Sequence, residues 1–153
     1  DCDLRRPTLH EKLKIVNSVG LSNYMVKNVT TKEIIRKTEV ENLWFIPAGP
    51  ILPNSSELIE AGVLDELIEE LKQQFDYVII DSTPAGLVAD ATLMIKYASF
   101  ILLVCRNEYT RKDVFTDVLN LFKTNNIDNF DIVFNDLNLK KSRYGRYDNY
   151  YKQ

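Results

Sequence analysis

The chain contains four short runs made only of apolar residues, at 43–46, 77–80, 100–104 and 132–134. Longer amphipathic stretches lie between them, and this alternation is typical of strands and helices that alternate in an α/β domain. Strands that are apolar throughout are expected where helices cover both faces of a parallel sheet. The sequence therefore predicts one α/β domain built on such a sheet, for which 153 residues are sufficient.

The amphipathic stretches predict three helices, at residues 56–74, 90–97 and 112–124. The first carries apolar side chains at the 3.6-residue spacing of a helix, at Leu64, Leu67, Ile68, Leu71 and Phe75. Ser55 and Ser56 offer hydroxyl groups that can cap its N-terminus. The third has a similar apolar stripe at Val114, Val118, Leu121 and Phe122.

Composition and charge exclude several classes of protein. No apolar run approaches the roughly 20 residues that a membrane-spanning helix needs, and no signal peptide is visible at the start. Cys2 and Cys105 are expected to be reduced thiols. Residues 140–153 carry a net charge of +4, which leaves −7 on the preceding body because the whole chain has −3. An acidic body disfavours nucleic acid as a partner.

Asp81 directly follows the apolar run at residues 77–80. It would stand at the carboxyl end of a buried strand, the edge at which open α/β sheets bind ligands. The same arrangement ends the Walker B element of phosphate-loop NTPases, whose carboxylate holds Mg²⁺. Aspartate is also a common turn former, so this position alone leaves both interpretations open.

The first six residues supply two carboxylates and two guanidinium groups, from Asp1, Asp3, Arg5 and Arg6. If they continue a strand, Asp1 and Asp3 point to the same side because strand side chains alternate. Such a pair can orient metal-bound water or accept a hydroxyl proton, and an arginine can stabilise phosphate charge. The alternative interpretation is a solvated charge cluster at a frayed terminus.

Further segments follow in an order that resembles one family. The start DCDLRRP is similar to a Walker A′ motif and YVIIDSTPAGLVADA to a Walker B motif, with GLSNYM, FIPAGPILPNSSELI, LLVCRNEYTRKD and VFND as further landmarks. A tyrosine-rich tail at residues 140–153 follows them. Together they resemble the bacterial tyrosine kinases (BY-kinases) of capsule and exopolysaccharide export across essentially the whole chain.

The resemblance implies a partial P-loop NTPase-like fold, ATP and Mg²⁺ as cofactors, and γ-phosphoryl transfer in trans within a homo-oligomer. The acceptors would be the tail tyrosines Tyr144, Tyr147, Tyr150 and Tyr151. Asp1 and Asp3 match the Walker A′ carboxylates and Asp81 the Walker B carboxylate. One of the Walker A′ pair would deprotonate the phenol, and the other would act with Asp81 around Mg²⁺. Asp3 and Asp81 are the expected metal ligands, while the choice of the base between Asp1 and Asp3 stays open.

Three further residues match positions that the resemblance associates with the cofactor. Arg5 and Arg106 would touch phosphate or a subunit contact, and Asn135 would recognise the nucleotide base. The resemblance also implies a cytoplasmic domain of an inner-membrane protein, with the polysaccharide export machinery and a tyrosine phosphatase as partners.

The chain departs from the family pattern in two places. Thr83 stands where the family usually has proline or a small residue. More seriously, the five glycines are scattered singly, and no glycine-rich phosphate loop with its lysine occurs. We therefore expect residues 1–139 to be the C-terminal part of a kinase domain, inactive alone, followed by a mobile tail at 140–153. The alternative functions are a non-catalytic phosphorylation substrate and scaffold, or, less favoured, a partitioning-type ATPase of the same fold.

Overall fold

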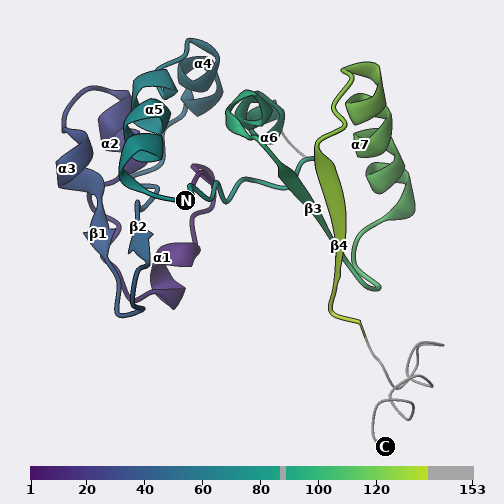
Figure 1. The fold of residues 1–153 in the computed structure, drawn as a ribbon, viewed down its shortest axis with the longest axis horizontal. Coiled ribbons are helices and arrows are strands. Elements are labelled where there is room, and N and C mark those ends of the chain that lie inside the picture. The colour runs from purple at the N-terminus through teal and green to yellow at the C-terminus, as the bar shows by residue number, and fades with distance from the viewer. Residues whose placement is uncertain (87–88, 138–153) are drawn as a thin grey trace, which may run out of the picture. The chain divides into compact units, whose positions relative to one another are not determined.

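A computed structural model describes residues 1–86 and 89–137 (Figure 1). The chain divides into two compact units, unit 1 at Asp1–Ala98 and unit 2, which begins at Ser99. The four tail tyrosines and the expected boundary at residues 139 and 140 lie outside the described residues. None of the described helices is long and apolar enough to span a membrane.

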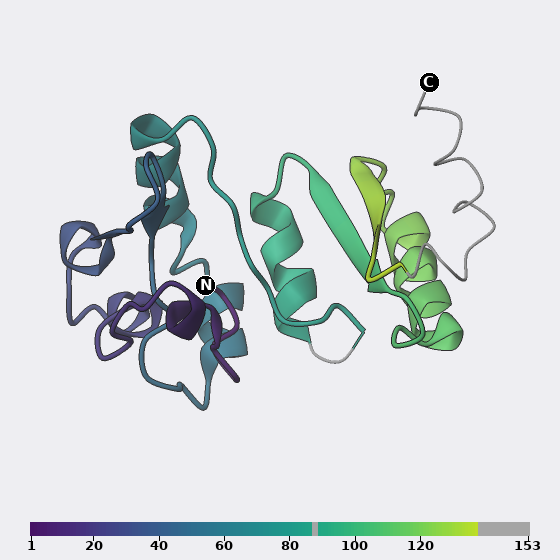
Figure 2. The ribbon, with the colours of Figure 1, turned by 90° about the horizontal axis from the view of Figure 1, so that it is seen from below.

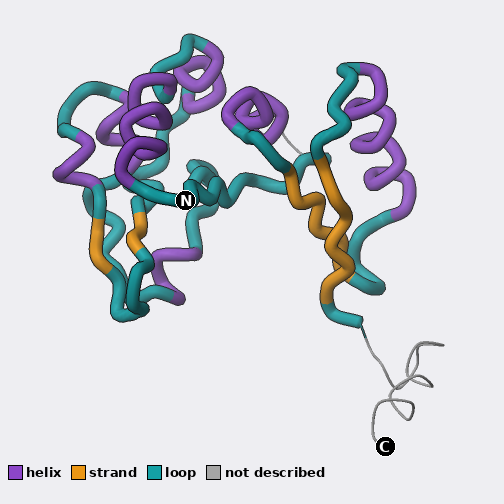
Figure 3. Tube along the Cα trace, in the orientation of Figure 1, coloured by secondary structure: helices purple, strands orange, loops and turns teal. Residues whose placement is uncertain are grey.

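Unit 1 is mainly helical, and its strands are very short (Figure 3). Its elements are α1 (Leu9–Lys12), α2 (Leu21–Met25), α3 (Thr31–Ile34), β1 (Arg36–Lys37), β2 (Trp44–Phe45), α4 (Ser55–Glu60), α5 (Asp65–Gln74), α6 (Ala89–Met94) and the 3₁₀ helix η1 (Ile95–Tyr97).

The apolar run at residues 43–46 forms β2, but its partner differs from the prediction. β2 pairs antiparallel with β1, with Arg36 opposite Phe45 and Lys37 opposite Trp44. The connection folds back tightly: Asn42 has a positive φ of 60°, and the Thr38 amide donates to the Leu43 carbonyl at 3.2 Å. A turn this tight joins antiparallel neighbours. The prediction that this run belongs to a parallel sheet is therefore wrong.

The run at residues 77–80 is not a strand of either sheet. Tyr77 and Ile79 are strongly exposed whereas Val78 and Ile80 are half-buried, so the segment keeps the two-residue alternation of extended chain. A strand also needs a paired neighbour, and within residues 1–86 and 89–137 no ladder forms along this run. The predicted strand is replaced by an extended segment with one face on the core.

The predicted helix at residues 56–74 is broken in two, as α4 and α5. Between them Gly62 adopts a φ of +77°, a conformation that residues other than glycine rarely accept. A Cβ at this position would lie 2.8 Å from Oδ2 of Asp65. The apolar stripe itself is confirmed, because Leu64, Leu67, Ile68 and Leu71 are buried. The expected N-cap is wrong, since Asn54 precedes α4 and neither serine caps it through its side chain.

The core of unit 1 lies around α2, α3, α4 and α5. Its buried residues are Leu4, Leu21, Met25, Ile34, Ala48, Ile59, Leu64, Leu67, Ile68, Leu71 and Met94. Leu4 is only 1% exposed. The opening segment is therefore anchored in the core between Asp3 and Arg5, and this anchor contradicts a frayed terminus.

Unit 2 follows the sequence prediction closely. β3 (Ile101–Arg106) and β4 (Phe130–Asn135) are parallel, in a register that runs from Ile101 opposite Phe130 to Arg106 opposite Asn135. α7 (Lys112–Thr124) connects them and lies alongside both strands (Figures 1 and 2). Phe122 of α7 meets Phe130 edge to face, with ring centroids 5.0 Å apart.

Two further predicted helices are confirmed, one in each unit. The helix predicted at 90–97 is present in unit 1 as α6 continued by η1, and the helix predicted at 112–124 is present in unit 2 as α7.

Candidate active site

Two backbone hydrogen bonds bring Asp1 close to Asp81 in unit 1. The Asp1 backbone nitrogen donates to the Ile46 carbonyl at 2.9 Å, and the Cys2 amide donates to the Asp81 carbonyl at 2.7 Å. Successive residues thus bond to opposite sides, as in a strand between two neighbours. Asp1 and Asp81 consequently stand at the same end of adjacent extended segments, although 80 positions of sequence separate them.

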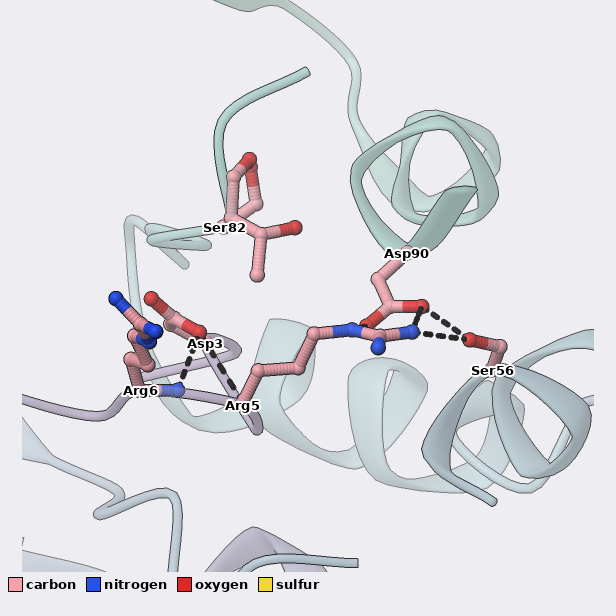
Figure 4. A network of polar contacts seen from close by, with 7 residues as sticks. Asp3, Arg5, Arg6, Ser56, Ser82 and Asp90 are labelled. Atoms are coloured by element: carbon pink, nitrogen blue, oxygen red, sulfur yellow. Dashed lines mark hydrogen bonds and ion pairs between the residues drawn. The ribbon is translucent and has the colours of Figure 1, made fainter. Parts of the chain in front are cut away.

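The carboxylates of the opening segment are held by backbone amides of the same segment. Oδ1 of Asp1 accepts from the Asp3 amide at 3.1 Å. Oδ1 of Asp3 accepts from the amides of Arg5 at 3.2 Å and Arg6 at 2.9 Å, as Figure 4 shows. Such local bonds are characteristic of aspartate in turns. The orientation of each carboxylate therefore depends on the conformation of the residues that follow it.

Asp1 has a second oxygen whose surroundings are unusual. Its Oδ2 is buried and has no hydrogen-bond partner in the part of the chain that the structure describes. A buried polar atom without a partner costs about 1–3 kcal/mol, more when it is charged. The hydroxyl of the buried Thr83, just after Asp81, is also without a partner among these residues. Oδ2 of Asp1 could thus accept a further hydrogen bond, and the Thr83 hydroxyl could donate or accept one.

Arg5 extends from the opening segment to a buried carboxylate on α6. Its Nε donates to Oδ2 of Asp90 at 2.8 Å, and one of its terminal nitrogens contacts Oδ1 at 3.3 Å and the Ser56 hydroxyl at 3.1 Å. Ser56 in turn donates to Asp90 (Figure 4). The Asp90 side chain is 2% exposed and that of Arg5 48%. The Arg5 hydrogen bond lowers the pKa of Asp90 against the opposing effect of burial, and Asp90 raises the pKa of Arg5.

Arg106 and Asn135 lie in unit 2, as paired residues at the carboxyl ends of β3 and β4. Nε of Arg106 donates to Oδ2 of Asp136 at 2.8 Å, and Oδ1 of Asn135 accepts from the Asp136 amide at 2.8 Å. The parallel register thus brings these two predicted residues together, with Asp136 engaging both. Their expected contacts with a cofactor stay predictions.

Comparison with known proteins identifies the family. A family model described as an AAA domain matches residues 7–139. The chain belongs to this AAA domain family. Tyrosine-protein kinase CpsD of Streptococcus agalactiae is 29% identical over 154 residues, which cover all of this chain and 67% of that protein.

Solved structures agree with this membership. The crystal structure of the chimerical protein CapA2B2 matches with a TM-score of 0.82 and 32% identity, over 88% of this chain and 60% of that one. The kinase domain of Escherichia coli tyrosine kinase ETK matches with a TM-score of 0.80 and 25% identity, over 87% and 52%. The resemblance to bacterial tyrosine kinases of capsule biosynthesis is thus confirmed, and so is the predicted P-loop NTPase-like fold class.

The chain is shorter than the relatives that it matches. The chain spans 67%, 49% and 63% of the length of three curated relatives that it matches, and only 16% and 20% of two longer ones. What the whole protein does, and with which partners, is therefore a matter for proposal.

The donor chemistry of the site suits Mg²⁺. Within residues 1–86 and 89–137 no group of three or more His, Cys, Asp or Glu residues gathers as a metal cluster. Mg²⁺ at phosphoryl-transfer sites needs only one or two carboxylates, because phosphates and waters complete its shell. The exposed Asp81 can supply one of these carboxylates, and the second can come from Asp3 or from Asp1, whose Oδ2 lacks a partner among the described residues. For the phosphates of ATP the 153 residues contain no Gly-Lys-Ser or Gly-Lys-Thr, so this chain does not itself supply their cradle.

Sequence reasoning missed Asp90, Ser56 and Asp136. Asp90 and Ser56 are 34 positions apart, and each stands in the first turn of a helix where polar residues are common. No periodicity relates either residue to Arg5. The only available signal was that Asp90 falls inside the segment resembling the Walker B motif, nine positions after Asp81.

Proposed function

We propose that this chain is part of a protein-tyrosine kinase domain that transfers the γ-phosphoryl group of ATP to tyrosines of a neighbouring copy. The observation that carries the proposal is the adjacency of Asp1 and Asp81, held by the hydrogen bond between the Cys2 amide and the Asp81 carbonyl at 2.7 Å. This hydrogen bond brings the segment resembling Walker A′ next to the segment resembling Walker B. Relatives named as tyrosine-protein kinases support the same function.

Within this proposal the metal-binding, proton-accepting and phosphate-accepting roles fall to different residues. Bound ATP and Mg²⁺ would supply the phosphoryl group and offset its charge. Asp81 and Asp3 would hold the metal, and Asp1 or Asp3 would accept the proton of the attacking phenol. The acceptors would be Tyr144, Tyr147, Tyr150 and Tyr151, presented in trans within a homo-oligomer. Each added phosphate contributes about −1.5 to −2 charges, so modification would reverse the positive charge of the tail.

The proposed cellular setting rests on the resemblance of the sequence motifs to those of BY-kinases. The domain would lie on the cytoplasmic side of an inner-membrane protein that regulates capsule or exopolysaccharide synthesis and export. Its partners would be the export machinery and a tyrosine phosphatase that resets the tail. Nucleic acid is not among the proposed partners, because residues 1–139 carry a net charge of −7.

A second candidate is a non-catalytic module that is phosphorylated by another kinase and acts as a scaffold. One observation favours it: the five glycines of the chain are single, and no lysine-containing phosphate loop accompanies them. The two candidates differ in whether the full-length gene product phosphorylates itself.

The test uses the purified full-length protein with ATP and Mg²⁺, and mass spectrometry of its C-terminal peptide. We expect phosphate on tyrosines between Tyr144 and Tyr151, and a loss of about 100-fold or more for Asp81→Asn because the metal loses a ligand. Asp76→Asn is the matched control, since Asp76 is an exposed aspartate five positions earlier. An unmodified tail in the wild-type protein would support the scaffold instead.

A further inference from the structure

Asp90 is a buried carboxylate beside the candidate site that has no role in the chemistry proposed above. It is 1% exposed and lies in the first turn of α6. A buried carboxylate is tolerated only when a cation and hydrogen-bond donors compensate its charge. Arg5 and Ser56 provide both, through Nε of Arg5 at 2.8 Å and the Ser56 hydroxyl.

This cluster of Arg5, Ser56 and Asp90 ties together three separate segments. Arg5 belongs to the opening segment, Ser56 to the first turn of α4 and Asp90 to α6. α4 and α6 also pack against each other. Figure 4 shows the Arg5 side chain stretched between the backbone that carries Asp3 and the two helix residues. The cluster therefore fixes the end of Arg5 to a packed helix pair.

The backbone of the same arginine also contacts the Asp3 carboxylate. Its backbone amide donates to Oδ1 of Asp3 at 3.2 Å, and the following amide of Arg6 donates to the same oxygen at 2.9 Å. On the other side Leu4 is buried in the core. A rotation of the backbone around residue 5 would break either the bonds to Asp3 or those to Asp90.

We infer that Asp90 and Ser56 act through Arg5 as positioning residues, which hold the Asp3 carboxylate in the orientation needed for metal-assisted phosphoryl transfer. The inference rests on the proposed kinase function and assigns Arg5 a role different from the phosphate contact that its motif suggested. Two of its guanidinium nitrogens are already engaged. The charge of Asp90 also offsets the attraction that Arg5 would exert on a phosphate.

The experiment measures tail phosphorylation by the full-length protein as a function of Mg²⁺ concentration at saturating ATP. Because residues that orient a metal ligand typically contribute about 10–100-fold to metal affinity or activity, we expect Arg5→Ala and Asp90→Asn each to raise the half-saturating Mg²⁺ concentration about tenfold. The double variant should be no worse than either single variant, because both changes remove one interaction. Ser56→Ala should have a smaller effect in the same direction.

Arg6→Ala is the matched control, since it removes a neighbouring exposed arginine. Within residues 1–86 and 89–137 its guanidinium takes part in no hydrogen bond or ion pair, and only its backbone amide contacts Asp3. Its half-saturating Mg²⁺ concentration should stay within twofold of wild type. An equal shift in Arg6→Ala and Arg5→Ala would overturn the inference, because charge rather than the contact with Asp90 would then matter.

Further outcomes separate the inference from the kinase proposal. Additive effects of Arg5→Ala and Asp90→Asn, or no shift in folded Asp90→Asn, would contradict the inference while leaving the kinase proposal intact. If Asp90→Asn does not fold, the inference is tested with Arg5→Ala and Arg5→Lys instead. These variants should fold, because the Arg5 side chain is half-exposed. Calorimetry of Mg²⁺ and ATP binding to the same proteins gives a second readout. If wild type binds Mg²⁺ and ATP but does not phosphorylate the tail, only the kinase proposal is contradicted. If wild type neither binds them nor phosphorylates the tail, both the kinase proposal and the inference are contradicted.

Discussion

Two ion pairs, one in each unit, have the same 2.8 Å separation but differ in the burial of their side chains. In unit 1 Arg5 contacts Asp90, whose side chain is 2% exposed, while in unit 2 Arg106 contacts Asp136 with both side chains more than half exposed. Removal of one member of a buried pair leaves an uncompensated charge, whereas an exposed pair contributes little because water replaces the partner. The distance between two charges is thus a poor guide to their importance without their burial.

The units also differ in how their strands find partners. β3 and β4 are joined by α7 in one continuous strand-helix-strand unit, so the pairing is local. In unit 1 β1 and β2 pair locally, but the opening segment meets its extended neighbours through distant residues, as when the Cys2 amide donates to the Asp81 carbonyl. The site of unit 1 therefore depends on long-range contacts, and that of unit 2 on the register of neighbouring strands.

The largest expected effect compares a buried leucine of unit 1 with an exposed leucine of unit 2. Leu64→Ala removes a side chain that is 1% exposed, and we expect it to lower the free energy of unfolding by about 3 kcal/mol. Leu102→Ala in β3, where the leucine is 61% exposed, should cost less than about 1 kcal/mol. Urea denaturation of the full-length variants measures both, and equal costs would contradict the difference in packing.

Asp90→Ala and Asp136→Ala compare the two ion pairs directly. We expect Asp90→Ala to lower the free energy of unfolding by about 2–3 kcal/mol, because it removes the contacts that satisfy Arg5 and Ser56 and leaves a cavity. Asp136→Ala should change it by less than about 1 kcal/mol. Thermal unfolding of each variant provides the measurement, and a larger loss for Asp136→Ala would reverse the comparison.

Acid titration examines the same contrast. The pKa of Asp90 lies below its ordinary value of 3.8 because the Arg5 hydrogen bond favours the charged form. A carboxyl whose pKa is lowered by folding contributes stability that is present above its unfolded-state pKa and is lost as pH falls through the folded-state value. From about pH 5 to about pH 3 wild type should therefore lose stability more steeply than Asp90→Asn.

Asp113 of unit 2 supplies the control for that titration. Its pKa is likewise lowered by a neighbour, Arg111, but its side chain is 58% exposed. Asp113→Asn should leave the acid slope nearly unchanged, because water screens an exposed pair. Parallel slopes for wild type and Asp90→Asn would contradict the linkage.

The smallest expected effect concerns one turn in each unit. Gly62→Ala forces a side chain into a φ of +77° and against Asp65, so we expect a loss of about 1 kcal/mol. Asn126, just after α7, also has a positive φ, and Asn126→Gly should be within about 0.5 kcal/mol of wild type because both residues tolerate this conformation. Chemical denaturation measures the two changes, and a neutral Gly62→Ala would exclude backbone strain as the cause of the helix break.

Local patterns predicted those elements whose partners are also local. The helix at 112–124 has the predicted bounds, and the runs at 100–104 and 132–134 form a parallel pair. The run at 77–80 failed as a strand because an apolar pattern cannot identify a paired neighbour. Gly62 was visible in the sequence, but the helix predicted at 56–74 ran across it, although its apolar stripe begins only at Leu64.

The sequence by itself determined the family, the carboxylates that end its extended segments, and the helix of unit 2, because each of these is written in neighbouring residues. Only the tertiary structure decided that Asp1 stands beside Asp81 and that Arg5 reaches Asp90. These contacts join residues 80 and 85 positions apart, and spacing along the chain carries no information about which distant groups meet. For the second contact, packing of α4 against α6 brings Ser56 to Asp90, and burial admits the Asp90 charge only because Arg5 and Ser56 satisfy it.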